Sequence, residues 1–390
     1  MPTLRIVEVP SGTKAFDWIV PKEWVVRNAY IETPNGTRIC EFGKNNLHLV
    51  GYSVAVNTTL KLEELQERLH SIPEQPDAIP YLTTYYKENW GFCISDNERR
   101  SLPRGNYKVV IDTEFIHGSL TYGELLIPGR RDEEIFLSTY ICHPSMANNE
   151  LSGPCVTTFL ALNLLERGDL NYSYRIVFVP ETIGSIVYIS KNLKHLKEKV
   201  YAGYNITCVG DEQGYSYLPS RAGDTISDEV ARHVLEYESG DYKSYEWRDR
   251  GSDERQYCWP GVDLPIASIM RTKYGSYGEY HTSLDTLGGV VTPSGLFGAY
   301  KVISNALHIL DKTSYPMSTT VCEPFLSRRS LYPELGNDIP VTEARVLLDI
   351  LSWCDGSNSV LDIAKRTKLY AMEVIKHLDI AKNTGLVRFQ

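Results

Sequence analysis

The sequence has no long apolar run: none of its hydrophobic stretches approaches the roughly 20 residues that a membrane-spanning helix requires. Its start, Met-Pro-Thr-Leu-Arg, also lacks the apolar segment of a secretory signal peptide. We therefore expect no membrane association and a cytoplasmic protein. An excess of positive charge is missing as well, because the formal net charge of −9 disfavours a broad surface for nucleic acids or other polyanions.

Closely paired cysteines are also missing. The eight cysteines are widely scattered, with no Cys-x-x-Cys pair among them, and most lie in apolar runs. This pattern predicts small buried residues in a reducing compartment. One of them, Cys142, directly precedes His143. Neighbouring residues of a strand point to opposite faces, so we do not expect these two side chains to form a catalytic pair.

The chain is long enough for two or three domains, at 390 residues, and its hydrophobic fraction of 42% is ordinary for a soluble globular protein. Residues 16–126 alternate strand-like runs with turn clusters, and one amphipathic helix near 60–69 interrupts them. We predict a β-rich domain here, inserted into a larger domain of residues 1–15 and 127–320. The predicted strands are 24–31, 48–56, 107–111 and 124–127.

Between residues 127 and 312 the pattern changes to strand and helix in alternation. Continuous apolar runs between amphipathic helices predict an α/β fold, with a mostly parallel sheet covered on both faces. The predicted strands include 134–141, 174–179 and 202–209, and the predicted helices include 154–165, 184–192, 228–235 and 293–310. Ligands of such sheets bind at the carboxyl ends of the strands, where His143, Glu181 and Asp211 lie.

The tail, residues 321–390, is predicted to be a linker followed by a third unit. Helices are expected at 341–353, 360–366 and 370–384, with a short strand at 386–389. Three short helices and a terminal strand resemble a winged helix-turn-helix. Lys and Arg only roughly balance Asp and Glu over 341–390, which argues against DNA binding. We expect an interaction role, such as a homo-oligomer contact.

Histidines and carboxylates follow several strand-like runs. His143 and Glu150 share one strand-to-helix loop and are close enough to bind one ion, Glu181 follows another strand, and His281 comes from a distant loop. A hydrolytic zinc site needs such ligands, an open position and a carboxylate base. Each residue also has a structural explanation, a helix cap for His143 or Glu150 and a surface loop for His281. Their shared position after strands favours the metal site.

The order strand-His, Asn-Asn-Glu-Leu-Ser-Gly, Pro-Glu-Thr-Ile-Gly-Ser and Tyr-His-Thr-Ser-Leu-Asp-Thr resembles the zinc exopeptidases of peptidase family M28. More closely, it resembles aminopeptidase-like proteins that carry a β-rich insertion and a C-terminal winged helix, often linked with surface-polysaccharide gene sets. The resemblance implies that His143 and His281 bind zinc and that Glu181 is the general base. It also implies that Tyr280 hydrogen-bonds the developing oxyanion.

The sequence departs from this family at three positions. Asn149 stands where an aspartate bridges two metals, Thr182 follows Glu181 where a second glutamate is usual, and Thr207 replaces a zinc-binding aspartate. The remaining anionic ligands carry too little negative charge to hold two divalent cations. We therefore predict one zinc ion per chain rather than two. Its predicted ligands are His143, Glu150 and His281, with Glu181 activating its water and Asp211 as a reserve ligand.

Several further residues are candidates for supporting roles. Asp253 and Asp285 are predicted to orient His281 or bind a substrate amine, although Asp285 equally suits a helix or turn cap. Arg255 and Arg271 are predicted to bind a substrate carboxylate, with solvated surface positions as the alternative. The aromatic cluster of the insertion is predicted either to wall the site or to belong to a core strand; its members are Tyr85, Tyr86, Trp90 and Phe92.

Three functions stay open from the sequence. The first is a zinc-dependent amide hydrolase that cleaves a small peptide or another amide, most simply an aminopeptidase. The second is a metal-dependent amidohydrolase for a non-peptide amide, such as an acylated amino sugar or a biosynthetic intermediate. The third is a binding or regulatory protein whose altered site no longer holds metal.

Overall fold

The computed structural model describes residues 2–85, 87–332 and 341–389. An eight-stranded sheet lies at its centre, in the order β1-β10-β12-β11-β13-β16-β14-β15. The neighbours β12, β11, β13 and β16 are parallel, whereas β10 is antiparallel to both β1 and β12. The strands are β1 (Arg5–Pro10), β10 (Ser119–Ile127), β11 (Glu134–Tyr140), β12 (Ser173–Val179), β13 (Val200–Asn205), β14 (Ser216–Leu218), β15 (Lys243–Ser244) and β16 (Ile266–Met270).

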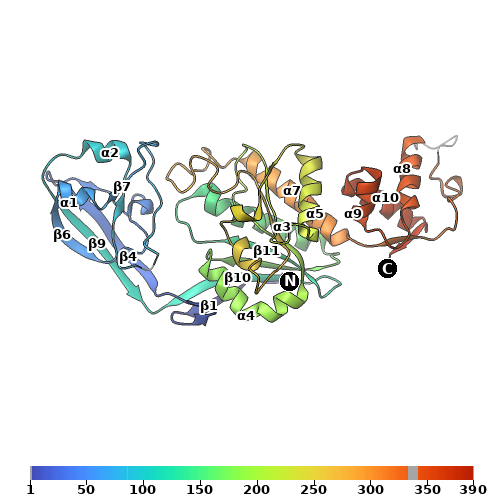
Figure 1. Ribbon diagram of the computed structural model, residues 1–390, viewed down its shortest axis with the longest axis horizontal. Coiled ribbons are helices and arrows are strands. Elements are labelled where there is room, and N and C mark those ends of the chain that lie inside the picture. Colours follow the sequence, from blue (N-terminus) through green and yellow to red (C-terminus); the bar gives the residue numbers. More distant parts are fainter. Residues whose placement is uncertain (1, 86, 333–340, 390) are drawn as a thin grey trace.

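Helices cover both faces of this sheet (Figure 1). One face packs against α3 (Ser152–Arg167), α5 (Ile226–Glu238) and α7 (Pro293–Lys312), and the other against α4 (Ile183–Lys199) and the short α6 (Glu254–Tyr257). Along β11, Ile135 and Leu137 enter the first core and Phe136 enters the second, as the alternation of a strand requires. The predicted α/β fold with a large, helix-flanked sheet is confirmed.

The insertion forms a separate four-stranded sheet with its own apolar core. Its order is β5 (Arg38–Ile39), β4 (Glu23–Glu32), β9 (Asn106–Ile116), β6 (Val56–Lys61). The strand predicted at 48–56 is wrong, because η1 (Asn46–His48) is a 3₁₀ helix, and isolated bridges, a turn and irregular backbone follow it until β6. The predicted helix is shorter than expected, α1 (Leu62–Gln66), and a second one is α2 (Asp96–Ser101).

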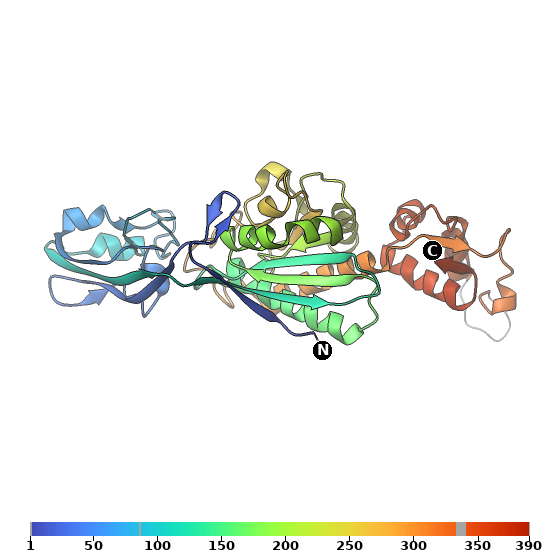
Figure 2. The same cartoon turned by 90° about the horizontal axis from the view of Figure 1, so that it is seen from below.

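Smaller elements connect the insertion to the central sheet. The run at 124–127 lies in β10 of the central sheet, which β9 approaches through residues 117–118. A hairpin of β2 (Lys14–Ala15) and β3 (Trp18–Ile19) precedes β4, and β7 (Leu69–His70) pairs with β8 (Phe92–Cys93). Figures 1 and 2 show an elongated molecule, with the insertion at one end and the C-terminal unit at the other.

The C-terminal unit contains α8 (Val341–Ser352), α9 (Val360–Thr367) and α10 (Ala371–Asn383), and β17 (Pro316–Ser318) pairs with β18 (Val387–Phe389). This arrangement confirms the predicted winged helix-turn-helix. Residues 333–340 of the predicted linker lie outside the described residues. His233 of α5 accepts the backbone N–H of Ala371 at 2.9 Å, which ties the unit to the central domain.

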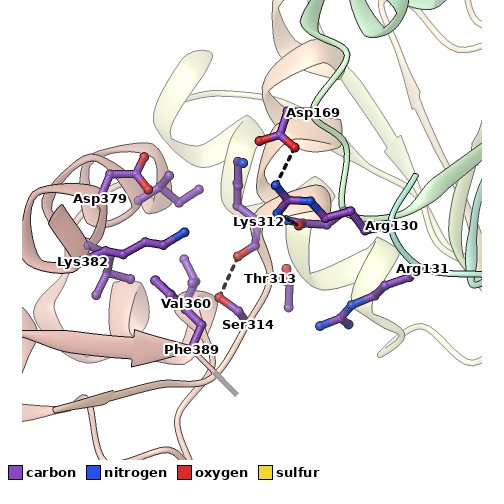
Figure 3. A pocket seen from close by; sticks show the side chains of 13 residues that line it. Arg130, Arg131, Asp169, Lys312, Thr313, Ser314, Val360, Asp379, Lys382 and Phe389 are labelled. Atoms are coloured by element: carbon purple, nitrogen blue, oxygen red, sulfur yellow. Dashed lines mark hydrogen bonds and ion pairs between the residues drawn. The ribbon is translucent and has the colours of Figure 1, made fainter. Parts of the chain in front are cut away.

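A cavity of about 200 Å³ lies between the central domain and the C-terminal unit (Figure 3). Charged side chains of both parts line it, including Lys312 on one side and Asp379 and Lys382 on the other. Arg130 forms an ion pair with Asp169 at 2.7 Å on its rim. None of the helices in the described ranges combines the length and hydropathy of a bilayer span.

Candidate metal centre and active site

The loop after β11 carries the first candidate ligand. β11 ends at Tyr140, and an irregular loop then leads to a π-helical turn, η2 (Ala147–Leu151), which continues into α3. Asp285 caps this turn, since its carboxylate accepts the backbone N–H groups of Asn148 and Asn149 at 2.7 and 2.9 Å. Asp285 was predicted either to support the metal site or to cap a helix or turn, and the structure shows it as a cap.

His143 is buried and has a carboxylate beside each ring nitrogen. Oε2 of Glu150 lies 3.3 Å from Nδ1, and Oε2 of Glu181 lies 3.5 Å from Nε2. The same Glu150 oxygen accepts the backbone N–H of His143 at 2.8 Å. A carboxylate beside Nδ1 orients the imidazole so that Nε2 faces the candidate metal position. The geometry therefore favours an orienting role for Glu150 over the predicted role as a ligand.

His281 approaches the same centre from the loop between β16 and α7. Its ring centroid is 5.3 Å from that of His143, and its ring stacks on Tyr280 at 3.9 Å. Burial, and then the charge of His143, lower the pKa of His281 to about 4, so the ring is neutral near pH 7. Among the described residues, its buried Nε2 has no hydrogen-bond partner. A neutral imidazole with a free buried nitrogen suits a metal ligand.

Glu181 follows β12 on a turn that Asp253 holds in place. Burial raises the pKa of Glu181, although the charges of His143 and Arg255 oppose this shift. Thr182 has a φ of 64°, which is unusual for a β-branched residue. Asp253 Oδ1 accepts the Thr182 N–H at 2.8 Å, and Arg255 donates to the Thr182 hydroxyl. Asp253 is thus a positioning residue of this turn, rather than the predicted partner of His281.

A second consequence of this packing concerns Asp253 itself. The side chain is fully buried, and its Oδ2 has no hydrogen-bond partner within the described part of the chain. Burial, and then the nearby charge of Glu181, raise the pKa of Asp253 to about 8. Two carboxyl groups this close repel each other when both are ionised, so their protonation is linked.

Neutral side chains occupy two positions where metal-binding carboxylates were expected from the resemblance, Asn149 and Thr207. Asn149 Nδ2 donates to the Tyr140 hydroxyl at 2.6 Å, and the Thr207 hydroxyl donates to the same oxygen. Asn149, Thr207 and Tyr140 are all buried. Burial raises the pKa of Tyr140 well above its usual range, so this hydroxyl stays neutral too. The network supplies no negative charge, which suits one divalent ion better than two.

Tyr81 is a residue of this site that the sequence did not reveal. It belongs to the insertion, yet its ring meets both histidine rings edge-on, with centroids 5.4 Å from His143 and 5.1 Å from His281. Its backbone N–H donates to the His281 carbonyl at 2.8 Å, and Ile79 and Ser283 exchange two hydrogen bonds at 2.9 Å beside it. The insertion therefore forms a wall of the centre. Of the predicted aromatic cluster, Phe92 belongs to the core of the insertion and Trp90 packs against that core, whereas Tyr86 lies outside the described residues.

Two predicted site residues hold a neighbouring loop instead. Arg271 is buried, its Nε donates to the Asp211 carbonyl at 2.7 Å, and its guanidinium lies 4.0 Å above the ring of Tyr215. The Asp211 carboxylate accepts four hydrogen bonds, at 2.6–3.0 Å, from Asn148, Gln213 and twice from Thr272. Because these groups are already satisfied, the structure favours neither a metal role for Asp211 nor a substrate role for Arg271.

Cys142 lies beside His143, contrary to expectation. Strand alternation does not apply to it, because β11 ends two residues earlier. Its Sγ lies 3.4 Å from His143 Nδ1 and accepts the backbone N–H of Glu181 at 3.2 Å. In the described ranges, the ligand atoms of Cys142, His143 and Glu150 lie within 4.8 Å of one another, a grouping that does not include His281. Burial raises the pKa of this thiol well above its usual range, which disfavours the thiolate that a ligand or nucleophile needs.

These features define the class as an aminopeptidase-like α/β protein with a C-terminal winged helix-turn-helix. Solved structures of zinc aminopeptidase from Bacillus subtilis and of a peptidase M28 precursor from Shewanella amazonensis share the fold. The first has a TM-score of 0.57 at 12% identity and covers 79% of this chain and 84% of its own. The second has a TM-score of 0.56 at 13% identity, with 80% and 84% covered. Such low identities establish the fold alone.

The chain belongs to the family described as domain of unknown function DUF4910, whose model matches residues 1–313, and a winged helix-turn-helix model matches residues 314–389. A Clostridium acetobutylicum protein named "Putative polysaccharide biosynthesis protein with aminopeptidase-like domain" is 42% identical over 388 residues, 97% of this chain and 88% of the relative. The crystal structure of a "putative peptidase" from the same organism has a TM-score of 0.92 at 40% identity, covering 100% of this chain and 88% of its own.

Proposed function

We propose that this protein is a metal-dependent amide hydrolase that uses one divalent ion, with zinc as the first candidate. One observation carries the proposal: the partly buried Glu181 carboxylate lies 3.5 Å from Nε2 of His143, beside a second histidine, His281, whose buried nitrogen has no partner in the described part of the chain. Two imidazoles next to a carboxylate are the groups from which hydrolytic zinc sites are built.

His143 and His281 would hold the ion, and Glu150 would fix the ring of His143 from its other nitrogen. When bound, such an ion polarises the amide carbonyl and lowers the pKa of water in the site. The neutral network of Tyr140, Asn149 and Thr207 supports one ion rather than two. The fit rests on the donor atoms themselves, because the lone pair of His281 Nε2 has no other use in the described structure.

Glu181 would serve as the base that takes a proton from the attacking water and returns it to the leaving amine. Burial raises its pKa toward neutral pH, which improves both transfers, since a group is most effective when its pKa is near the working pH. Asp253 keeps the Glu181 turn in place through the Thr182 N–H. Tyr280, stacked on His281, would donate its hydroxyl to the developing oxyanion, and burial raises its pKa so that the proton is retained.

The scissile bond would be an amide, and the two substrate classes are small peptides and acylated amino sugars. The fold shared with zinc aminopeptidases supports a peptide. The name of the Clostridium acetobutylicum relative, which refers to polysaccharide biosynthesis, supports an amide of a sugar. A screen of dipeptides and N-acyl amino sugars with the zinc-loaded protein separates these classes.

The test of the proposal is Glu181→Gln, with Glu133→Gln as the matched control at an exposed position before β11. We expect Glu181→Gln to keep its zinc and to lose amide hydrolysis by a factor of about 10²–10⁴, as expected for a general base. Glu133→Gln should behave as the wild type in both assays. Zinc loss in Glu181→Gln would instead make Glu181 a ligand, and unchanged turnover would refute its role altogether.

A further inference from the structure

A cavity of about 610 Å³ lies on the side of the central domain where α4 and α6 pack. Its walls come from the β2–β3 hairpin and the segment that follows α6. Three aromatic side chains line it while staying unusually exposed: Phe16 at 49%, Trp18 at 40% and Trp259 at 57%. Exposed aromatic rings gathered in one hollow are typical of a binding site rather than of a core.

One face of α4 forms the apolar floor of this cavity. Ile186, Ile189 and Leu193 all line it, and their spacing of three and four residues places them on one side of the helix. The volume falls within the range of small-molecule sites, roughly 300–1,000 Å³. The cavity is therefore large enough for one or two ring-sized groups.

Two guanidinium groups and one carboxylate lie among these apolar walls. Trp247 holds the side chain of Arg250 in place: the Arg250 guanidinium lies 5.0 Å above the Trp247 ring, and its Nη1 donates to the Trp247 carbonyl at 3.2 Å. Arg255 donates to the Thr182 hydroxyl, yet its buried Nε has no partner in the described ranges. With Asp17 opposing them, the lining keeps one excess positive charge. Guanidinium groups bind carboxylates and phosphates with paired hydrogen bonds.

Arg255 links this cavity to the candidate active site. Arg255 lines it and touches Thr182, the residue directly after Glu181. Asp253, two residues before Arg255, holds the same turn from the buried side. A ligand paired with Arg255 would therefore lie beside the turn that carries the proposed base.

We propose that this cavity is the subsite for the non-scissile part of the substrate, and that it binds a sugar unit bearing a carboxylate or phosphate group. The inference rests on the proposed amide hydrolysis and names its substrate class. Sugar rings offer flat C–H faces to tryptophan rings, and the acidic group would pair with the two arginines. The name of the relative, which refers to polysaccharide biosynthesis, points to the same chemistry.

The inference is tested by calorimetric titration of Glu181→Gln, which binds without turnover. The probes are glucuronic acid, N-acetylglucosamine 1-phosphate and neutral N-acetylglucosamine. We expect at least one acidic sugar to bind more tightly than the neutral one, and which of them binds distinguishes a carboxylate from a phosphate. Adding Trp259→Ala or Arg250→Gln should weaken that binding about tenfold, which is the effect of roughly 1.4 kcal/mol.

The matched controls are Phe297→Ala, an aromatic residue of α7 that is 65% exposed, and Arg104→Gln, an exposed arginine of the insertion. Both should bind the acidic sugar as the parent does. Equal affinity for neutral and acidic sugars, or no effect of Trp259→Ala, would overturn the inference. So would sedimentation showing a dimer that Trp18→Ala converts to monomers, because the cavity would then be a subunit interface. None of these results bears on whether Glu181→Gln keeps its zinc and loses amide hydrolysis. The two proposals can therefore be refuted independently of each other.

Discussion

The substitution Asn149→Asp tests why this site suits one ion. Asn149 is 1% exposed, and its amide donates to the Tyr140 hydroxyl at 2.6 Å. A carboxylate there loses this donor and lies close to Asp285, whose Oδ2 accepts the backbone N–H of the same residue. A lost buried hydrogen bond costs about 1–3 kcal/mol, and an unpaired buried charge costs about 3–5 kcal/mol unless it takes up a proton. We expect the metal-free variant to lose about 3 kcal/mol of unfolding free energy at pH 7.

The assay is urea unfolding in the presence of a chelator and then with added zinc. Burial and Asp285 would raise the pKa of the new carboxyl in the folded state, so the loss should shrink at acid pH and grow as the pH rises. Zinc should restore stability and raise the metal content above that of the wild type. The exposed Asn89→Asp is the control and should change stability by less than about 0.5 kcal/mol. A metal-free variant as stable as the wild type, with no additional zinc, would refute the reasoning.

Three further predictions concern residues around the centre and its supports. Tyr81→Ala should weaken zinc affinity about tenfold in a chelator competition, because the ring that packs on both histidines is lost, whereas Tyr81→Phe should keep it; equal affinities of both variants with the wild type would contradict this. Burial, and then Lys365, lower the pKa of His233 to about 4, below its usual 6.5. The stability that neutral His233 provides is therefore complete above about pH 6.5 and is lost as the pH falls toward 4, by up to about 3 kcal/mol. His233→Gln should flatten that part of the stability–pH profile, and an unchanged slope would count against it. Arg271→Gln should lower the unfolding free energy by about 2 kcal/mol without changing KM, since its partners are structural; a raised KM with unchanged stability would restore the predicted substrate role.

The central sheet could be predicted because its strands are buried on both faces, which leaves apolar runs such as residues 176–179 of β12. The C-terminal unit could be predicted equally well, since its three helices have clear boundaries. The insertion was harder to predict. The run at 48–56 has strand-like composition, yet isolated bridges and turns rather than a ladder satisfy its backbone. Pairing partners far along the chain decide such cases, and composition does not report them.

The candidate site, too, could be predicted only where the sequence pattern places its residues. The structure brings together His143, Glu150 and Glu181, which follow strands of one sheet and so meet at its edge. The structure does not favour the roles predicted for Asp211 and Arg271, because groups of a neighbouring loop satisfy them, and a sequence does not show which carbonyl an arginine meets. Tyr81 was missed because backbone hydrogen bonds, which any sequence can form, dock the insertion against His281.

Metal content per chain is the most direct test of the central claim, measured by plasma mass spectrometry after zinc loading and removal of free ion. We expect one zinc in the wild-type protein and in Cys142→Ser, because the raised pKa of the Cys142 thiol keeps it protonated. His143→Ala and His281→Ala should each lose it, whereas Asp211→Asn should keep it. No zinc in the loaded wild type, or a full zinc in either histidine variant, would contradict the account.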